Sequence, residues 1–169
     1  MDKFTVGIVT LSDKGSAGQR VDESGPAIAA MLPGEVFEVV SARILPDGKE
    51  TLMEELKRLS DEVHCDLVLT TGGTGFSPRD LTPEATLAVA DRLAPGIAEA
   101  MRLKSLEITD RAMLSRAASV IRGSTLIVNL PGSPKSVREN LSFILGALPH
   151  GLEILRGDGG ECAAPETKG

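Results

Sequence analysis

The most constraining feature of this sequence is a unit that occurs twice: an apolar run, a turn that contains glycine, and a helix opened by proline. The first copy is LVLTTGGTGFSPRDLTPE, from Leu67 to Glu84, and the second is TLIVNLPGSPKSV, from Thr125 to Val137. Short apolar runs of this kind are typical of strands that are covered on both faces. Because parallel strands place such turns at one edge of a sheet, we expect both turns to face one ligand.

Helical patterns separate the apolar runs along the rest of the chain. Two further strands are predicted at 5–11 and 36–45, because both stretches are rich in β-branched and apolar residues. Helices are expected at 24–32, 51–63, 82–93 and 97–106, and a last helix opens at Ser133 with one apolar face that reaches Leu148. The polar stretch 15–25 is predicted to be a loop, and 107–122 a helix followed by a loop or a short strand.

Strands that alternate with helices predict an α/β protein, here a three-layer α/β/α sandwich with a mostly parallel sheet in a single domain. The domain is expected to span residues 1–156, and residues 157–169, which lack periodicity, are expected to form a disordered tail. Ligands of such sheets bind beyond the carboxyl ends of the strands. The turns after Leu11, Thr71 and Leu130 are therefore expected to meet there.

Composition excludes several classes of partner. The formal charge of −6 on 169 residues argues against a nucleic-acid or anionic-membrane surface. No apolar run approaches the roughly 20 residues of a membrane span, and the first residues lack the apolar segment of a signal peptide, so a cytoplasmic location is expected. Cys65 and Cys162 suit free thiols, and two histidines cannot build a zinc cluster. Without Trp or Tyr for base stacking, a nucleotide would be held through phosphate and backbone contacts.

The glycine turn matches neither of the common phosphate-binding motifs. It lacks the lysine of a P-loop, and Pro78 stands where a dinucleotide-binding fingerprint requires its third glycine. Gly72, Gly73 and Gly75 nevertheless supply a backbone that can take positive φ angles and turn several N–H groups toward one anion. The turn is thus predicted to bind a phosphate.

The second turn, PGSPK, leads into a helix N-terminus, whose free N–H groups and dipole also favour an anion. Ser133 and Lys135 add a hydroxyl and a positive charge. An ordinary strand-to-helix connection with a serine cap and a proline in the first turn would look the same. The presence of two such turns at one sheet edge favours a functional role.

Asp80 follows the glycine turn, and a carboxylate beside a phosphate is repelled unless a cation lies between them. Mg²⁺ commonly bridges one or two carboxylates and substrate phosphates, so Asp80, with Asp47 or Asp13, is a candidate ligand set. The structural alternatives are a pair with Arg79 or a helix cap for Asp80, and a cap or turn role for Asp47, which stands three residues before Glu50. Thr82 is expected to cap the helix that follows, with Pro83 in its first turn. Ser115, Arg116 and Arg102 are weaker candidates for the site.

Four segments stand in order along the chain: SDKGSAGQRVDESGP, TTGGTGFSPRDLTPEAT, MLSR and NLPGSPK. Together they resemble the molybdopterin adenylyltransferase family, which includes MogA and MoaB in bacteria and related domains of gephyrin and of plant cofactor-biosynthesis proteins. The resemblance runs from about Val6 to Leu155, and neither long motif departs from the family pattern.

The resemblance implies a cytoplasmic, homotrimeric nucleotidyltransferase of molybdenum cofactor biosynthesis. Such an enzyme transfers AMP from Mg-ATP to the terminal phosphate of molybdopterin and releases pyrophosphate; it uses small-molecule substrates and contacts other cofactor-biosynthesis proteins transiently. Asp80 and Asp47 would be catalytic and would hold Mg²⁺. Carried over by motif, the nucleotide-binding residues would be Ser12, Asp13, Ser24, Gly25, Gly72, Gly73, Thr74 and Gly75. The molybdopterin-binding residues would be Ser115, Arg116, Asn129, Pro131, Gly132, Ser133 and Lys135.

Two other functions fit the same motifs. A non-catalytic molybdopterin carrier or scaffold would bind the pterin without using ATP, although it would have no need for carboxylates beside a metal. A different phosphoryl or nucleotidyl transferase would use the same turns on another acceptor. The missing catalytic histidine does not argue against an enzyme, because an attacking phosphate is already an anion and needs no base.

Overall fold

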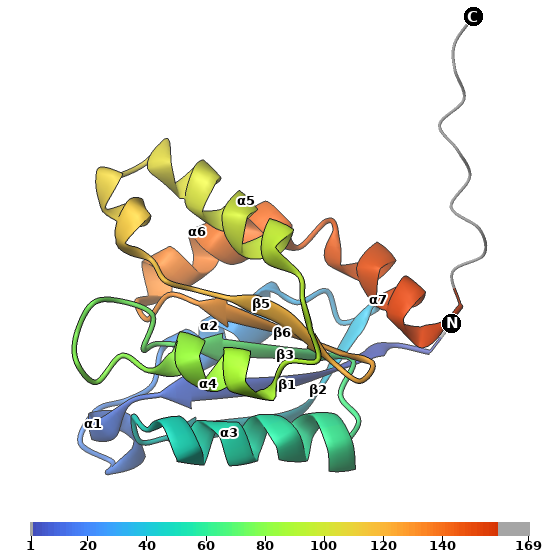
Figure 1. Cartoon of the computed structure of the whole chain (residues 1–169), viewed down its shortest axis with the longest axis horizontal. Coiled ribbons are helices and arrows are strands. Elements are labelled where there is room, and N and C mark those ends of the chain that lie inside the picture. Colours follow the sequence, from blue (N-terminus) through green and yellow to red (C-terminus); the bar gives the residue numbers. More distant parts are fainter. Residues whose placement is uncertain (1, 159–169) are drawn as a thin grey trace, which may run out of the picture.

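The computed structural model describes residues 2–158, which form one six-stranded sheet between two layers of helices (Figure 1). The strands are β1 (Phe4–Leu11), β2 (Phe37–Leu45), β3 (Leu67–Thr71), β4 (Arg92–Leu93), β5 (Ser119–Arg122) and β6 (Thr125–Leu130). The α-helices are α1 (Asp13–Ser16), α2 (Ser24–Met31), α3 (Lys49–Lys57), α4 (Thr82–Val89), α5 (Pro95–Leu106), α6 (Pro134–Ile144) and α7 (Leu148–Arg156). A π-helical turn, η1 (Arg58–Glu62), continues α3, and a 3-10 helix, η2 (Asp110–Leu114), follows α5.

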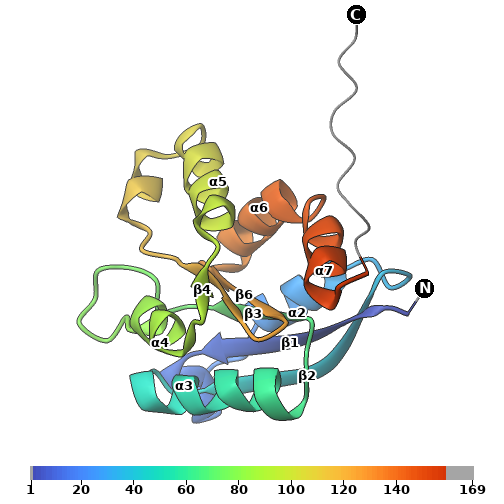
Figure 2. The same ribbon diagram turned by 45° about the vertical axis from the view of Figure 1, so that its right-hand side comes forward.

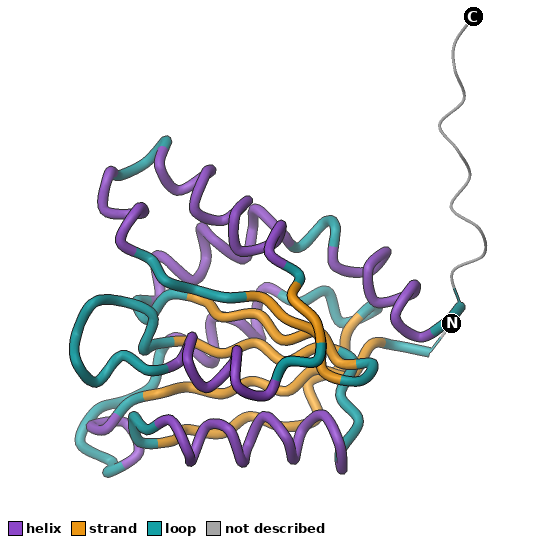
Figure 3. Tube along the Cα trace, viewed as in Figure 1, coloured by secondary structure: helices purple, strands orange, loops and turns teal. Residues whose placement is uncertain are grey.

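The strand order is β2-β1-β3-β6-β5-β4. Strands β2, β1, β3 and β6 are parallel, whereas β5 runs antiparallel to β6 and to the two-residue strand β4. The tube in Figure 3 shows the strands gathered in the middle layer with helices on either side. The predicted α/β/α architecture with a mostly parallel sheet is therefore confirmed.

Successive side chains of the central strands point into two separate cores. In β3, Leu67 and Leu69 join a cluster with α2, α5, α6 and α7, whereas Val68 between them joins a cluster with α3 and α4. Figure 2 shows these two helix layers on opposite sides of the sheet. This two-sided burial explains why β3 reads as a continuous apolar run rather than an alternating one.

Some predicted boundaries differ from those in the structure. The helix predicted to reach residue 93 ends at Val89, and Arg92–Leu93 instead pair with β5 as a short edge strand. The prediction of a helix followed by a loop or a short strand in 107–122 is confirmed: η2 is followed by β5, which connects to β6 through Gly123 at a φ of +56°. Part of the loop predicted at 15–25 belongs to the single turn α1.

The last predicted helix is in fact two. Helix α6 ends at Ile144 and α7 begins at Leu148, with Pro149 in its first turn. Pro149 is tolerated in the first turn of α7, but within one continuous helix it would lack the N–H that donates to Leu145, so the helix is interrupted before it. The predicted apolar face survives the break, since Leu141, Ile144 and Leu148 are all buried in one cluster. The predicted tail lies, from residue 159 onward, outside the described residues.

No helix among residues 2–158 combines the length and the apolar character needed to cross a membrane.

The amino-terminal ends of β1 and β3 are held together by Asp66. Its carboxylate accepts hydrogen bonds from the backbone N–H and the hydroxyl of Thr5, at 2.8 and 3.0 Å, and from the Nε and Nη2 of Arg156, at 2.9 and 2.7 Å. The guanidinium also lies 4.3 Å from the centre of the Phe4 ring. Burial raises the pKa of Asp66, but the bonds from Arg156 and Thr5 outweigh it and hold the pKa below its usual value.

We expect Asp66→Asn to lower the free energy of unfolding by about 2 to 3 kcal/mol at pH 7, since the variant breaks a largely buried ion pair. A depressed folded-state pKa stabilises the protein above the pKa of the unfolded chain, and this contribution disappears as the pH falls through the folded-state value. Urea unfolding of both proteins from pH 7 downward should therefore show the two stabilities converging in acid.

A matched control is Glu107→Gln, which removes a carboxylate that is 71% exposed and 3.9 Å from Lys104. Such a pair contributes at most about 1 kcal/mol. A difference between wild type and Asp66→Asn that stays constant down to pH 2 would contradict the assignment.

Candidate functional site

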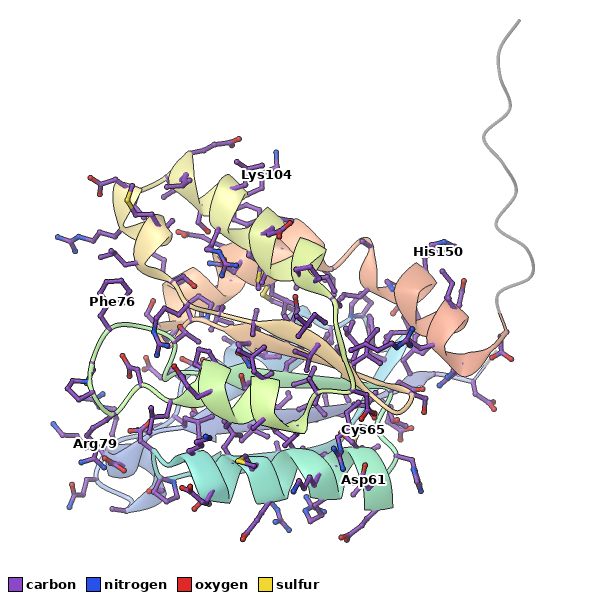
Figure 4. All side chains as sticks on the ribbon, viewed as in Figure 1. Asp61, Cys65, Phe76, Arg79, Lys104 and His150 are labelled. Carbon is purple, nitrogen blue, oxygen red and sulfur yellow. The ribbon has the colours of Figure 1, made fainter. Side chains whose placement is uncertain are left out.

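The turns after β1, β3 and β6 meet at one end of the sheet, as predicted. In Figure 4, Phe76 and Arg79 project from the loop at this end, whereas Asp61 and Cys65 lie at the opposite end of the strands. Beside the turns is an open cavity of about 560 Å³. Its lining includes Thr10, Ser12, Arg20, Asp22 and Ser24 from the first part of the chain, Thr71 and Gly72 from the glycine turn, and Gly132, Ser133 and Pro134 from the second turn.

The glycine turn is packed so tightly that side chains are excluded. Gly72 and Gly73 have φ angles of +97° and +70°, in the region that favours glycine. A Cβ atom on Gly72 would lie 2.6 Å from the carbonyl oxygen of Leu11, and one on Gly73 would collide with the hydroxyl of Thr82. The turn is therefore fixed between the end of β1 and the start of α4.

Thr82 does not have the cap role predicted for it. The residue that precedes the helix is Leu81, and the Thr82 hydroxyl donates instead to the carbonyl of Gly72 at 2.9 Å. The backbone N–H of Thr82 donates to the carbonyl of Gly73 at 3.1 Å. Pro83 lies in the first turn of α4 as expected. The start of α4 thus holds the glycine turn from behind.

The second turn is pressed directly against the first. The Thr71 hydroxyl donates to the carbonyl of Pro131 at 2.6 Å, and the Gly72 N–H donates to the carbonyl of Leu130 at 3.3 Å. Ser133 caps α6 as predicted, because its hydroxyl accepts from the N–H of Ser136 at 3.2 Å. Lys135 is 82% exposed, with its Nζ only 3.7 Å from Glu139. The two predicted anion-binding turns are therefore neighbours.

Asp22 was not predicted as a site residue, although it holds together the segment SDKGSAGQRVDESGP through several hydrogen bonds. Its carboxylate accepts from the backbone N–H groups of Ser24 and Gly25, at 3.0 and 3.2 Å, and from the hydroxyl of Thr10 at 2.9 Å. The Ser24 hydroxyl in turn donates to the carbonyl of Gly132 at 2.7 Å. Ser24 and Gly25 consequently fix α2 against the second turn. The available signal was an aspartate two residues before a serine at a helix start, a common local capping arrangement.

Three carboxylates gather beside the glycine turn. The backbone N–H of Asp47 donates to Asp13 at 3.0 Å, and Asp13 also pairs with Arg79. Burial, followed by repulsion from Asp13, raises the pKa of Asp47 above its usual value, and Asp80 adds to the repulsion. An ionised Asp47 therefore has an unfavourable environment that a nearby cation would relieve.

The helix-cap roles for these carboxylates and the pair of Asp80 with Arg79 were wrong, whereas Asp47 does lie in a bend before α3, as its turn alternative allowed. Gly48, not Asp47, precedes α3, and no side chain caps that helix. Asp80 neither pairs with Arg79 nor caps α4; its Oδ2 accepts from the N–H of Ser77 at 3.0 Å. Within residues 2–158 no group of three acidic, histidine or cysteine side chains is arranged to hold a metal by itself.

A second cavity, of about 250 Å³, lies on the other side of the two turns, between α5, η2 and α6. Thr74 and Gly75 of the glycine turn and Pro131 and Ser136 of the second turn reach into it, together with Arg102, Arg111 and Ser115. One guanidinium nitrogen of Arg102 already donates to the carbonyl of Ala117 at 2.7 Å. Cavities on both sides give the paired turns access to two ligands.

Two residues expected in the pterin site have other partners. Asn129 is fully buried: its amide donates to the hydroxyls of Thr70 and Thr86, at 3.0 and 2.9 Å, and its Oδ1 accepts from the N–H of Ala118 at 3.1 Å. Its role in the structure is to join β6 to its neighbours. Arg116 bonds to the loop that follows the glycine turn rather than lining either cavity.

The comparisons with known proteins agree with this geometry. Residues 7–150 match the family model described as a probable molybdopterin-binding domain. The chain belongs to that family. It is 42% identical to the molybdopterin adenylyltransferase of Haemophilus influenzae, over 90% of this chain and 84% of the relative. It is 49% identical to the molybdopterin biosynthesis enzyme MoaB of Thermus thermophilus, with a TM-score of 0.86 over 91% of this chain and 97% of that one.

A third relative shows the family domain within a larger protein. Gephyrin of Dictyostelium discoideum is 39% identical over 91% of this chain, which corresponds to only 23% of gephyrin. The family resemblance read from the four segments is thus confirmed. The mostly parallel sheet with its turns at one edge is the fold of the solved MogA and MoaB structures that the chain resembles.

The tight glycine turn generates a prediction within this family fold. Gly72→Ala should lower the free energy of unfolding by about 2 kcal/mol or more, because the variant combines an unfavourable φ with a backbone collision. Urea unfolding measures the loss. Gly34→Ala is the control, since a Cβ there meets nothing within 4 Å. Equal stabilities for both variants would show that the turn is not held as described.

Proposed function

We propose that the protein is a molybdopterin adenylyltransferase of molybdenum cofactor biosynthesis. It transfers AMP from ATP to the terminal phosphate of molybdopterin and releases pyrophosphate. The observation that carries this proposal is the contact between two anion-binding turns beside three carboxylates, in a chain that is 42% identical to an enzyme named for this activity. Two phosphate-bearing substrates can be brought together only where such groups are adjacent.

The two turns divide the substrates between them. Gly72, whose own N–H is bonded to Leu130, shapes the turn so that the backbone N–H groups of Gly73, Thr74 and Gly75 can bind the nucleotide phosphates, and Ser12 and Asp13 flank them. The turn from Pro131 to Lys135 receives the pterin phosphate at the start of α6, where the helix dipole and the charge of Lys135 favour an anion, although Ser133 already caps the N–H of Ser136. Ser115, in the wall of the second cavity, lies on the same side as Pro131.

The reaction needs alignment more than acid–base chemistry. An oxygen of the molybdopterin phosphate attacks the α-phosphorus of ATP, a new P–O bond forms, and the bond to the leaving pyrophosphate breaks. Because the nucleophile is already an anion, the protein must chiefly overcome repulsion and hold the reacting groups in line. The site contains hydroxyls, backbone amides and charged groups suited to that task.

Asp80 and Asp47 are the proposed ligands of Mg²⁺, which when bound would neutralise charge on the transferring phosphates. The raised pKa of Asp47 supports this assignment, since burial and, after it, the carboxylate of Asp13 disfavour its negative charge. Arg79, which pairs with Asp13, supplies only one positive charge against the three carboxylates.

We also propose that the enzyme works in the cytoplasm as a homotrimer, with transient contacts to other proteins of the pathway. Support for self-association is the exposed apolar surface of β2, where Val40 and Ile44 are 44% and 39% exposed on an edge strand. A carrier that only binds molybdopterin is the weaker alternative, because it would gain nothing from a group of carboxylates that oppose one another.

The deciding experiment is a product assay with molybdopterin, ATP and Mg²⁺, and the same mixture without Mg²⁺. We expect adenylylated molybdopterin and pyrophosphate only when Mg²⁺ is present. Asp80→Asn should lower the rate on the order of a hundredfold, the size of losing one electrostatic stabiliser. The amide oxygen of the variant can still accept from Ser77, so the fold should persist. Near-normal product from the variant would remove Asp80 from the mechanism, and pterin binding without product would favour the carrier.

Lys135→Gln tests the second turn. If the exposed ammonium attracts the pterin phosphate through its charge, the variant should bind molybdopterin more weakly, and the difference should grow as salt is lowered. Equilibrium titrations at several salt concentrations measure this. Lys104→Gln, on α5 and also exposed, is the control (Figure 4). Identical salt dependence for the two variants would exclude a phosphate contact at Lys135.

A further inference from the structure

Arg116 bonds to four residues of the segment 74–84, which begins in the glycine turn and runs into α4. Its backbone N–H donates to the carbonyl of Thr74 at 2.9 Å, and its Nε donates to the carbonyl of Gly75 at 2.8 Å. One Nη donates to the carbonyl of Asp80 at 2.5 Å, and the other pairs with the carboxylate of Glu84. Arg116 thus reaches across from the segment that enters β5, at least 32 residues away along the chain from each of its side-chain partners.

These bonds close the loop 75–80, because one guanidinium holds the carbonyls at both of its ends. Between those ends the side chains of Phe76 and Arg79 are exposed, at 68% each. The hydrogen bonds within the loop are local: the N–H of Ser77 donates to Asp80, and the N–H of Asp80 donates back to the carbonyl of Ser77. The loop also reaches Asp13 through the ion pair of Arg79, but an exposed pair holds a loop weakly, so a further anchor is needed to keep one conformation.

Glu84 orients that anchor. It lies in the first turns of α4, whose start is already bonded to the glycine turn through Thr82. The bond from Arg116 lowers the pKa of Glu84, so the carboxylate stays ionised and paired. Its Oε2 atom is buried without a hydrogen-bond partner among the described residues, although the side chain as a whole is 38% exposed, so the ion pair with Arg116 fixes the direction of the carboxylate.

We propose that Arg116, aimed by Glu84, is a positioning residue that fixes the loop 75–80 and so places the Asp80 carboxylate for the reaction. This inference rests on the proposed function of Asp80. It gives Arg116 a role different from the pterin contact expected from the sequence. A planar guanidinium can serve several acceptors in fixed directions, which the single ammonium of a lysine cannot.

The test is Arg116→Lys, which keeps the positive charge but loses the planar guanidinium and its N–H donors in fixed directions. A misplaced Asp80 should lower kcat about tenfold to a hundredfold, with the KM values for ATP and molybdopterin changed by less than about threefold. The variant should also need more Mg²⁺ to reach half of its maximal rate. Hydrogen exchange followed by mass spectrometry should show faster exchange in the peptide that covers residues 75–81.

Arg122→Lys is the matched control. Arg122 lies at the other end of β5 and has the same kind of fork, to Asp61 at 3.0 and 2.6 Å and to the carbonyl of Val89 at 2.9 Å. Arg122→Lys should lower the stability by about as much as Arg116→Lys does, without changing kcat or hydrogen exchange in residues 75–81. Glu84→Gln serves as a second variant, since its amide oxygen can still accept from Arg116 while the charge is lost. It should show the same loss of kcat in weaker form.

The outcomes separate the two proposals. Unchanged exchange in residues 75–81 of Arg116→Lys would overturn the positioning role, as would a raised KM for molybdopterin with an unchanged kcat. A wild-type protein that forms no adenylylated product would instead refute the proposed function. Hydrogen exchange compared between the wild-type protein and Arg116→Lys would still show whether Arg116 fixes the loop.

Discussion

The site depends on the contact between the two turns at the ends of β3 and β6. The Thr71 hydroxyl and the Gly72 N–H donate across the gap to Pro131 and Leu130, and a Cβ on Gly132 would lie only 3.4 Å from the Cα of Gly72. Backbones can approach this closely only where glycine removes the side chains. Segments separated by some 60 residues of sequence thereby become one surface, lined on both sides by cavities.

The pKa values of carboxylates are shifted in opposite directions at the two ends of the sheet. At the amino-terminal end, Asp66 is paired with Arg156 and its pKa is depressed, so its ionisation stabilises the fold. At the site, burial and Asp13 raise the pKa of Asp47, so ionisation of Asp47 opposes folding above the pKa of the unfolded chain. Such an unfavourable charge is expected where a ligand later supplies the compensation. The fold thus gains stability at the end that does no chemistry.

The sequence was sufficient for the features that depend on local pattern. The strands at 5–11 and 67–71, the serine cap at Ser133 and the meeting of the two turns were predicted correctly from periodicity and turn residues. The errors share a physical cause, which is bonding to distant residues. Thr82 looked like a cap but bonds to Gly72, and β4 exists only because β5 lies beside it. Whether Asp80, Asp47 or Lys135 contacts a substrate remains a prediction.

The arrangement also explains why the site needs more than a glycine turn. A turn of backbone N–H groups attracts any phosphate, but two phosphates held 3 to 4 Å apart repel each other strongly at low dielectric. Opposing carboxylates would worsen that repulsion unless a cation enters with the nucleotide. In the proposed mechanism the carboxylates would therefore make simultaneous occupation of both turns depend on the metal. A loop that held Asp80 loosely would weaken that dependence, and so the bonds of Arg116 to Gly75 and Asp80 matter for chemistry as well as for order.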